Sequence, residues 1–327
     1  MTRRLLLVLT LIGALGSPVA FAAPITGIVV IGDSLSDGGN GFALTGGAFP
    51  PAPYAQRASN GPVAVEYMAQ LLGVPLLPAA LGGSNYAVLG ALTGTENFAA
   101  ATYSQPALAN TGMLAQTAQY LGSAAVIDPA GTLFVVWGGP NDFFVDPSAA
   151  SAATALNNLA TTISALYAAG ARRFLVPNMA DLSLTPSGLA LPPDLAASLQ
   201  ALTIGFNTGL DGTLDSLEGL LPGLDITRFD TFTLMTMIAA NPGAFGFSNA
   251  TQPCITGILT GSPTICADPS GFVFWDSVHP TTAAHQVLGT AFARSVPEPA
   301  TLSLLLVAGA VGLHARRRRS GRHGRTV

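Results

Sequence analysis

The sequence of 327 residues contains no lysine, and charged residues make up only 9% of it. Its basic residues are all arginines, of which two lie in the first four positions and six in the last twelve. The chain from residue 23 to 295 holds five basic and sixteen acidic side chains, a net charge of about −11. A surface of this sign repels nucleic acid and anionic lipid. Both are therefore excluded as resting partners, and the arginine-rich end is not a binding patch.

Long apolar runs are also missing, since the apolar stretches at the two ends are shorter than the roughly 20 residues that span a bilayer. Arg3 and Arg4, an apolar run over 5–15 and small residues up to Ala22 form the pattern of a secretory signal peptide. We expect cleavage after Ala22, so that residues 1–22 are removed.

The C-terminal end has the opposite order of features. The segment Val296-Pro297-Glu298-Pro299 precedes an apolar run over 300–313 and four consecutive arginines from Arg316. A tail anchor with its arginines on the cytoplasmic side is one interpretation. The pattern also resembles the PEP-CTERM sorting signal, which implies removal of the tail by an exosortase during export. On that interpretation residues 296–327 contact the membrane only transiently. The domain at 23–295 then reaches the cell envelope, the outer surface or the extracellular matrix.

Cysteine is scarce, with Cys254 and Cys266 as its only two positions. Neither has a further ligand at metal-binding spacing, so a zinc site or a free catalytic thiol is not expected. Because export leads to an oxidising compartment, we expect a local disulfide between them.

Strand and helix signals alternate along 23–295. Apolar runs at 28–31, 133–137 and 174–176 predict strands, 224–229 is expected to be a further short strand, and 85–91 is expected to be extended. Apolar residues at helical spacing predict helices over 63–72, 111–121 with Thr111 as cap, 149–169, 194–210 and 281–294. This alternation predicts one domain, a three-layer α/β/α sandwich with a mostly parallel sheet.

Polar turns follow the two clearest strands. Ser34 comes just after the strand at 28–31, and Asn141 follows the strand at 133–137. The carboxyl ends of parallel strands form the edge where α/β sheets bind ligands. A serine at such a turn is either a nucleophile or a helix N-cap, and this segment alone does not separate the two.

Histidine is scarce as well, because two of the four lie in the C-terminal tail. His285 falls at the margin of the apolar stripe of the helix predicted at 281–294, so we expect a boundary residue. His279 lies in the preceding loop, three residues after Asp276. A serine nucleophile needs a base, and the base needs a carboxylate. Ser34, His279 and Asp276 meet that need, although Asp276 could also be a helix cap.

Four blocks carry a resemblance to the SGNH (GDSL-type) hydrolases, in the same order and spacing. They are Gly32-Asp33-Ser34-Leu35, Gly90 within 85–91, Gly138-Gly139-Pro140-Asn141-Asp142 and Asp276-Ser277-Val278-His279-Pro280. The resemblance implies a flavodoxin-like SGNH hydrolase fold with Ser34 as nucleophile, His279 as general base and acid, and Asp276 as orienting carboxylate. It implies an oxyanion hole built from the N–H groups of Ser34 and Gly90 and the side-chain amide of Asn141. It implies no metal and no organic cofactor.

Two features bear on the substrate. Leu89 stands where the second block of the family often has glycine, and we expect it to narrow the acyl pocket or reshape the turn. The apolar loop over 42–53 either lines an acyl site or is an ordinary surface loop.

The expected reaction is ester hydrolysis through an acyl-serine by an exported esterase or lipase acting on lipids or acylated carbohydrates. Two alternatives remain open. One is a carbohydrate O-deacetylase of the same fold. The other is a non-catalytic binding protein of the envelope or matrix.

Overall fold

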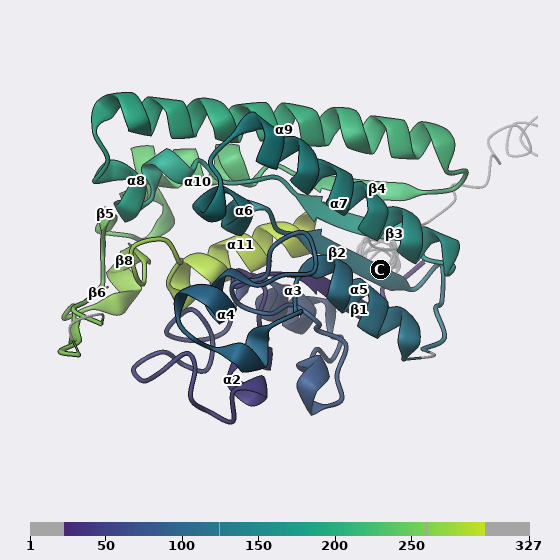
Figure 1. The fold of residues 1–327 in the computed structure, drawn as a ribbon, viewed down its shortest axis with the longest axis horizontal. Helices are drawn as coiled ribbons and strands as arrows, with labels where there is room; N and C mark the ends of the chain where they lie inside the picture. The colour runs from purple at the N-terminus through teal and green to yellow at the C-terminus, as the bar shows by residue number, and fades with distance from the viewer. Residues whose placement is uncertain (1–22, 124, 259–260, 298–327) are drawn as a thin grey trace, which may run out of the picture. The chain divides into compact units, whose positions relative to one another are not determined.

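A parallel four-stranded sheet in the order β1-β2-β3-β4 forms the centre of Ile25–Val296 (Figure 1). The computed structural model describes residues 23–297 apart from 124 and 259–260. The strands are β1 (Gly27–Gly32), β2 (Thr132–Trp137), β3 (Arg173–Pro177) and β4 (Asp225–Phe229). Each predicted strand is present to within one residue at either end. The expected signal peptide and the tail from 298 onward lie outside the described residues.

An irregular fifth segment runs along the free side of β1. The Val30 N–H donates to the Ser84 carbonyl (3.1 Å), and the Tyr86 N–H donates to the Val30 carbonyl (2.8 Å). The segment expected to be extended at 85–91 is therefore paired with β1, although it is not a regular strand. The chain thus passes from β1 to one neighbour and then crosses to β2 on its other side. Such a switch point opens a crevice at the carboxyl end of β1, where ligands bind.

Helices cover both faces of this sheet. The covering helices are α3 (Ala64–Leu72), α5 (Met113–Gly122), α7 (Ala149–Ala168), α9 (Pro193–Leu220), α10 (Thr231–Ala240) and α11 (Thr282–Ser295). Shorter helices are α2 (Asn40–Leu44), α4 (Phe98–Thr102), α6 (Pro140–Val145) and α8 (Pro186–Leu189). The five predicted helices correspond to α3, α5, α7, α9 and α11, with α9 extending well beyond its predicted end.

The β-branched run of β1 explains the layering, because successive side chains of a strand point to opposite faces. Val30 packs in the core shared with α3, α10 and α11, whereas Ile31 packs in the core shared with α5, α7 and α9. Figure 1 shows α7 and α9 side by side over that second face. The predicted three-layer α/β/α sandwich with a parallel sheet is confirmed.

The start of α5 differs from the prediction. Its N-cap is Gly112, and Thr111 does not cap it. The Thr111 hydroxyl instead donates to the Leu108 carbonyl (2.6 Å) and accepts from Asn97 Nδ2 (2.9 Å). The predicted cap was wrong because this hydroxyl is engaged by the preceding loop.

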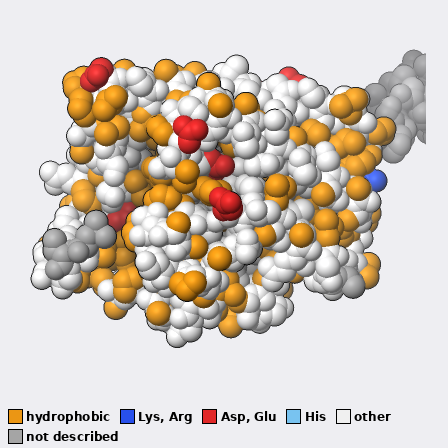
Figure 2. Space-filling view, viewed as in Figure 1, with side chains coloured by type: hydrophobic (Ala, Val, Ile, Leu, Met, Phe, Trp, Pro, Cys, Tyr) orange, Lys and Arg blue, Asp and Glu red, His pale blue; other side chains and the backbone are white. Residues whose placement is uncertain are grey.

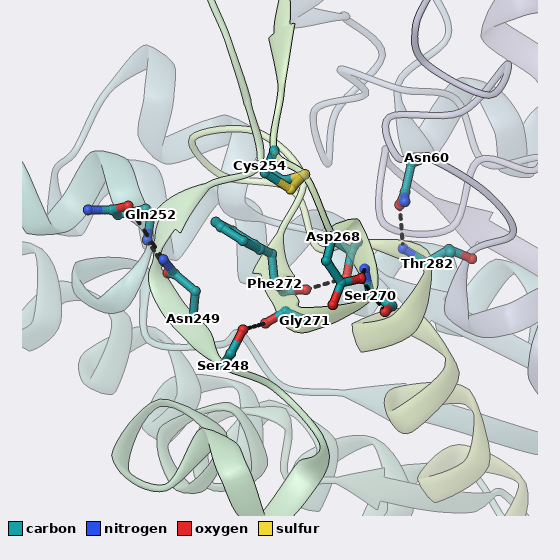
Figure 3. Close-up of a disulfide and its surroundings, with 12 residues drawn as sticks. Asn60, Ser248, Asn249, Gln252, Cys254, Asp268, Ser270, Gly271, Phe272 and Thr282 are labelled. Atoms are coloured by element: carbon teal, nitrogen blue, oxygen red, sulfur yellow. Dashed lines mark hydrogen bonds between the residues drawn. A yellow bond between two sulfur atoms is a disulfide. The ribbon is translucent and has the colours of Figure 1, made fainter.

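Two small sheets, which the sequence did not predict, lie before the last helix. β5 (Asn249–Pro253) pairs with β8 (Phe272–Phe274), and β6 (Ile255–Thr256) pairs with β7 (Thr264–Ile265). Cys254 and Cys266 are joined by a disulfide beside them (Figure 3). β8 continues directly into the loop at 275–280, so these sheets hold the predicted His279 block.

The face drawn in Figure 2 carries acidic side chains near its middle and basic ones only at its edge. This agrees with the acidic balance of residues 23–295. Within the part of the chain that the structure describes, no helix is both long and apolar enough to cross a bilayer. The apolar run over 300–313 lies outside that part.

Candidate active site

Ser34 lies in a tight turn directly after β1. The N–H groups of Ser36 and Asp37 both donate to the Asp33 carbonyl, at 3.1 and 2.9 Å. The turn leaves Ser34 7% exposed, at the carboxyl end of the sheet. The next helix, α2, has Gly39 as its N-cap. Ser34 is therefore not a helix cap, the alternative that its segment left open.

The structure brings Ser34, His279 and Asp276 into one hydrogen-bonded row. His279 Nε2 lies 2.9 Å from Ser34 Oγ, and His279 Nδ1 lies 2.7 Å from Asp276 Oδ2. The N–H groups of Val278 and His279 donate to Asp276 Oδ1 at 2.9 and 2.7 Å. Asp276 therefore orients both the imidazole and its own loop, and it caps no helix, since Thr281 caps α11.

A fourth side chain reaches this row that no sequence motif predicted. The Tyr54 hydroxyl donates to Asp276 Oδ2 at 2.7 Å across 222 positions of sequence. A lone tyrosine in a Pro-rich loop carries no periodic or motif signal that could have singled it out.

Burial and neighbouring charges shift the pKa values of Asp276 and His279 in opposite directions. Burial favours a higher pKa for Asp276, but the His279 charge and three hydrogen bonds outweigh it and lower the pKa. Burial favours a lower pKa for His279, but Asp276 and then Asp33 outweigh it and raise the pKa above 6.5. The carboxylate therefore stays ionised while the imidazole is positioned to hold a proton.

Asp33 is a second buried carboxyl at this site. Burial raises its pKa to about 7, while the Leu35 N–H and the His279 charge act against that rise. Asp33 lines the same pocket as Ser34 and His279. Perturbed carboxyl and imidazole groups gathered in one cleft are typical of active sites.

His285 is not the boundary residue that the sequence predicted. It is 1% exposed, and its Nδ1 accepts a hydrogen bond from the Ala64 N–H at 3.2 Å. Burial, followed by the His279 charge, lowers its pKa to about 3. The prediction was wrong because α3 packs directly on α11 and covers this ring, so His285 is a neutral core acceptor.

Of the three expected oxyanion donors, Ser34 lies in the turn after β1, Gly90 follows the segment that pairs with β1, and Asn141 lies in the first turn of α6. Among the described residues, neither the Ser34 N–H nor the Gly90 N–H donates to another group. One amide hydrogen of Asn141 Nδ2 goes to the Ala91 carbonyl at 2.9 Å, which leaves the other free. Ser34 and Asn141 line one pocket, whereas Gly90 is not among the residues that line it, so the oxyanion hole stays a prediction.

Gly90 has a backbone and surroundings that only glycine fits. Its φ is +77°, and a Cβ there would lie 2.8 Å from the Ala99 nitrogen and 2.7 Å from Asn97 Oδ1. Gly46 has a similar φ of +65° with nothing within 4 Å of an added Cβ.

We expect Gly46→Ala to lower the free energy of unfolding by about 1–2 kcal/mol, the cost of a left-handed alanine. Gly90→Ala should cost clearly more and also slow ester turnover, because the turn must move to relieve the contact. Urea unfolding of both variants checks this. Equal losses in the two variants would contradict the steric argument.

Leu89 and the loop over 42–53 are not where an acyl site needs them. The Leu89 side chain packs in a small cluster with Val88, Ala99 and Leu108. Neither Leu89 nor any residue of 42–53 lines the pocket beside Ser34. Of the two effects expected of Leu89, a narrowing of this pocket is not found, because the Leu89 N–H donates to Asp37 Oδ2 at 2.8 Å and its side chain packs in that cluster. The other effect, a reshaped turn, stays a prediction.

A pocket of about 850 Å³, including its part open to solvent, begins at Ser34 and His279. Its lining is mostly apolar and comes from the ends of β2 and β8, the loops after β1, β3 and β8, and the helices α6, α10 and α11. Prominent lining residues are Trp137, Phe144, Met179, Leu182, Leu184, Met235, Ala239, Phe274, Val278 and Leu288. Sequence periodicity missed this pocket because α10 and the loop at 179–185 carry no pattern that marks a ligand site.

Metal ligands do not gather at this site. Across residues 23–297, leaving aside 124 and 259–260, no three His, Cys, Asp or Glu side chains form a group that could hold an ion.

Comparisons with known proteins identify the family of the chain. Residues 28–292 match the family described as GDSL-like lipase/acylhydrolase, and residues 295–319 match the PEP-CTERM protein-sorting motif. The thermolabile hemolysin of Vibrio parahaemolyticus is 29% identical over 275 residues, which cover 79% of this chain but only 61% of the hemolysin. A GDSL esterase/lipase of Arabidopsis thaliana is 28% identical over 338 residues, covering 87% of this chain and 89% of the plant protein.

Among solved structures, a member of the lipolytic protein G-D-S-L family from Veillonella parvula aligns with 83% of this chain and 95% of its own. Its TM-score is 0.44 and its sequence identity 13%.

The family match covers most of the chain and confirms the resemblance carried by the four sequence blocks. The sorting motif confirms the second resemblance and indicates export toward the cell envelope. The chain therefore belongs to the GDSL-like lipase/acylhydrolase family and is a hydrolase of ester bonds.

Proposed function

We propose that this protein is an exported serine esterase that cleaves carboxylic esters with apolar acyl chains. The observation that carries the proposal is the row of contacts from Ser34 Oγ through His279 to Asp276 Oδ2, at 2.9 and 2.7 Å. A serine paired in this way with a histidine and a carboxylate can be activated for acyl transfer.

In the first half of the reaction Ser34 Oγ attacks the ester carbonyl carbon, and His279 Nε2 takes the hydroxyl proton. The C–O bond to the alcohol then breaks, and His279 returns the proton to the leaving oxygen. In the second half His279 takes a proton from water, whose oxygen attacks the acyl carbon. The bond to Ser34 Oγ breaks, the proton returns to Ser34, and the free acid leaves.

Asp276 holds the imidazole through Nδ1, which leaves Nε2 free to accept the serine proton, and stabilises the imidazolium that forms. The Ser34 and Gly90 N–H groups and the free Asn141 amide hydrogen would stabilise the oxyanion. Loss of one such donor typically slows acyl transfer by about 10²–10³-fold.

The pocket beside Ser34 supports an apolar acyl group rather than a sugar. Sugars need many polar partners, whereas most residues of this lining are apolar and, beyond the catalytic candidates, its polar side chains are Asp33, Asp181, Thr185 and Thr231. A carbohydrate O-deacetylase or a non-catalytic binding protein is therefore less well supported and becomes an outcome of the experiment below.

The location follows from the two ends. Residues 1–22 would be removed as a signal peptide, the hydrolase domain would span 23–295, and an exosortase-type enzyme would process 296–327 after transient membrane contact. The mature enzyme would then act at the outer surface or in the extracellular matrix. The mass of the exported protein tests this processing directly.

Hydrolysis of p-nitrophenyl acetate, hexanoate and dodecanoate by the wild type and Ser34→Ala tests the proposed activity. We expect the two longer esters to give the higher kcat/KM and Ser34→Ala to lose turnover on all three. Ala239→Phe, which fills the pocket from α10, should impair dodecanoate more than acetate, while Ala240→Phe just outside the lining should impair neither.

The other outcomes are equally informative. Turnover confined to acetate would favour the deacetylase, for which acetylated polysaccharide is then the substrate to test. Absence of any Ser34-dependent turnover would favour the binding protein.

A further inference from the structure

The Asp276 carboxylate accepts four hydrogen bonds. Two backbone N–H groups reach Oδ1, and Oδ2 receives both His279 Nδ1 and the Tyr54 hydroxyl, each at 2.7 Å. A carboxylate has about four lone-pair directions, so the donors present use all of them. Tyr54 is the donor among the four that comes from outside the 276–279 turn.

We propose that Tyr54 is a positioning residue for catalysis, which holds Asp276 Oδ2 in place against His279 by donating to the same oxygen. The proposal rests on the hydrolase function proposed above and assigns a role that the Ser34, His279 and Asp276 row does not itself supply.

The loop that carries Tyr54 is anchored on both sides of the catalytic turn. The Tyr54 ring packs edge-on against Trp275, with ring centroids 6.2 Å apart. Ser59 Oγ donates to the Pro280 carbonyl at 2.8 Å, and the Thr282 N–H donates to Asn60 Oδ1 at 2.8 Å (Figure 3). The loop and the turn therefore hold each other at three successive points from 275 to 282.

The base of this loop is also fixed to the body of the protein. Arg57 pairs with Glu66 through two hydrogen bonds, and Glu66 Oε2 also accepts the Val63 N–H at the start of α3 (2.9 Å). The loop that carries the Tyr54 hydroxyl is thus held in place by hydrogen bonds to the start of α3. This is what a positioning contact requires.

Tyr54 can act only as a donor. Burial, followed by the Asp276 charge and their hydrogen bond, raises the pKa of Tyr54 above its usual value of 10. Its proton therefore stays on the phenol while His279 gains and loses its own. By sharing Oδ2, the phenol also draws negative charge away from the imidazole, which keeps the His279 pKa lower than Asp276 alone would set it.

Other ionisable groups near this pair come from neighbouring elements. They are Asp33 after β1, Tyr103 after α4 and His285 on α11. Tyr54→Phe leaves each of these residues in place and removes the phenol donor from Asp276 Oδ2, so we expect a shift in the titration of His279 to arise at Asp276.

Tyr54→Phe tests the role with little change of shape, and Tyr67→Phe is its matched control. Tyr67 also makes a 2.7 Å hydroxyl contact, to Thr282 Oγ1 on α11, but does not reach Asp276. We expect Tyr54→Phe to lower kcat on p-nitrophenyl hexanoate by about tenfold with KM nearly unchanged. The acid limb of kcat/KM should move to higher pH by roughly half a unit. Tyr67→Phe should keep both the wild-type kcat and the wild-type acid limb.

A second measurement is independent of turnover. In a Ser34→Ala background, NMR titration of the His279 ring should give a higher pKa when Tyr54 is also changed to Phe. Equal pKa values together with an unchanged acid limb would overturn the proposal, as would equal losses in Tyr54→Phe and Tyr67→Phe. If Ser34→Ala retains full turnover, the proposed function fails, and the NMR comparison still decides the role of Tyr54.

Discussion

His279→Ala should abolish ester hydrolysis, with kcat falling by about 10⁴–10⁶-fold. His279 lies 2.9 Å from Ser34 Oγ, and among the described residues no other imidazole contacts that hydroxyl. Without it the serine proton has no acceptor in either half of the reaction. Steady-state rates on p-nitrophenyl hexanoate, normalised to folded protein, measure the loss.

His285 provides the control for this experiment. Its ring is buried and neutral, and its Nδ1 takes the Ala64 N–H. His285→Ala should cost about 1–3 kcal/mol in the free energy of unfolding, because that N–H loses its partner. His285→Asn, whose side-chain oxygen can replace Nδ1, should recover part of the loss. Both variants should keep near wild-type kcat per folded molecule, and a loss as deep as that of His279→Ala would refute the assignment of the base.

Asp276→Asn should reduce kcat per folded molecule by about 10⁴-fold at neutral pH. The carboxylate accepts from His279 Nδ1 and so leaves Nε2 unprotonated for the serine. An amide that turns its NH₂ group toward the ring would stabilise the opposite tautomer. The Tyr54 hydroxyl and the N–H groups of Val278 and His279 also donate to this carboxylate. The NH₂ group of an asparagine would therefore face a hydrogen-bond donor in either orientation of its amide.

The direction in which Asp276→Asn shifts the acid limb of kcat/KM follows from the His279 pKa. In the wild type the raised His279 pKa places the acid limb of kcat/KM above pH 6.5, since only the neutral imidazole can accept the serine proton. Asp276→Asn removes the charge that raises this pKa and leaves burial to lower it. The residual activity should therefore have its acid limb at lower pH. A rate-pH series from pH 5 to 9 checks this, and a limb that stays in place would show that Asp276 does not set the His279 pKa.

Local signals in the sequence predicted the elements of the sheet well. The run Ile28 to Ile31 has β-branched side chains on both faces, so it reads as a buried strand without knowledge of its neighbours. The start of α11 was predicted equally well, because the Thr281 hydroxyl caps the helix by accepting from the Ala284 N–H, only three residues away. Thr111 shows the limit of such signals, since a hydroxyl at the right spacing was already bonded to Leu108 and Asn97.

The sequence by itself determined the parallel sheet, the turn that presents Ser34 and the loop that carries Asp276 and His279. These depend on residues only a few positions apart, whose backbone preferences and side-chain periodicity act locally. The tertiary structure decided what surrounds them: the burial of His285 under α3, the apolar pocket walled by α10, and the contact of Tyr54 with Asp276. Such contacts join segments up to 222 positions apart and depend on how whole helices and loops pack, which leaves no periodic trace in the chain.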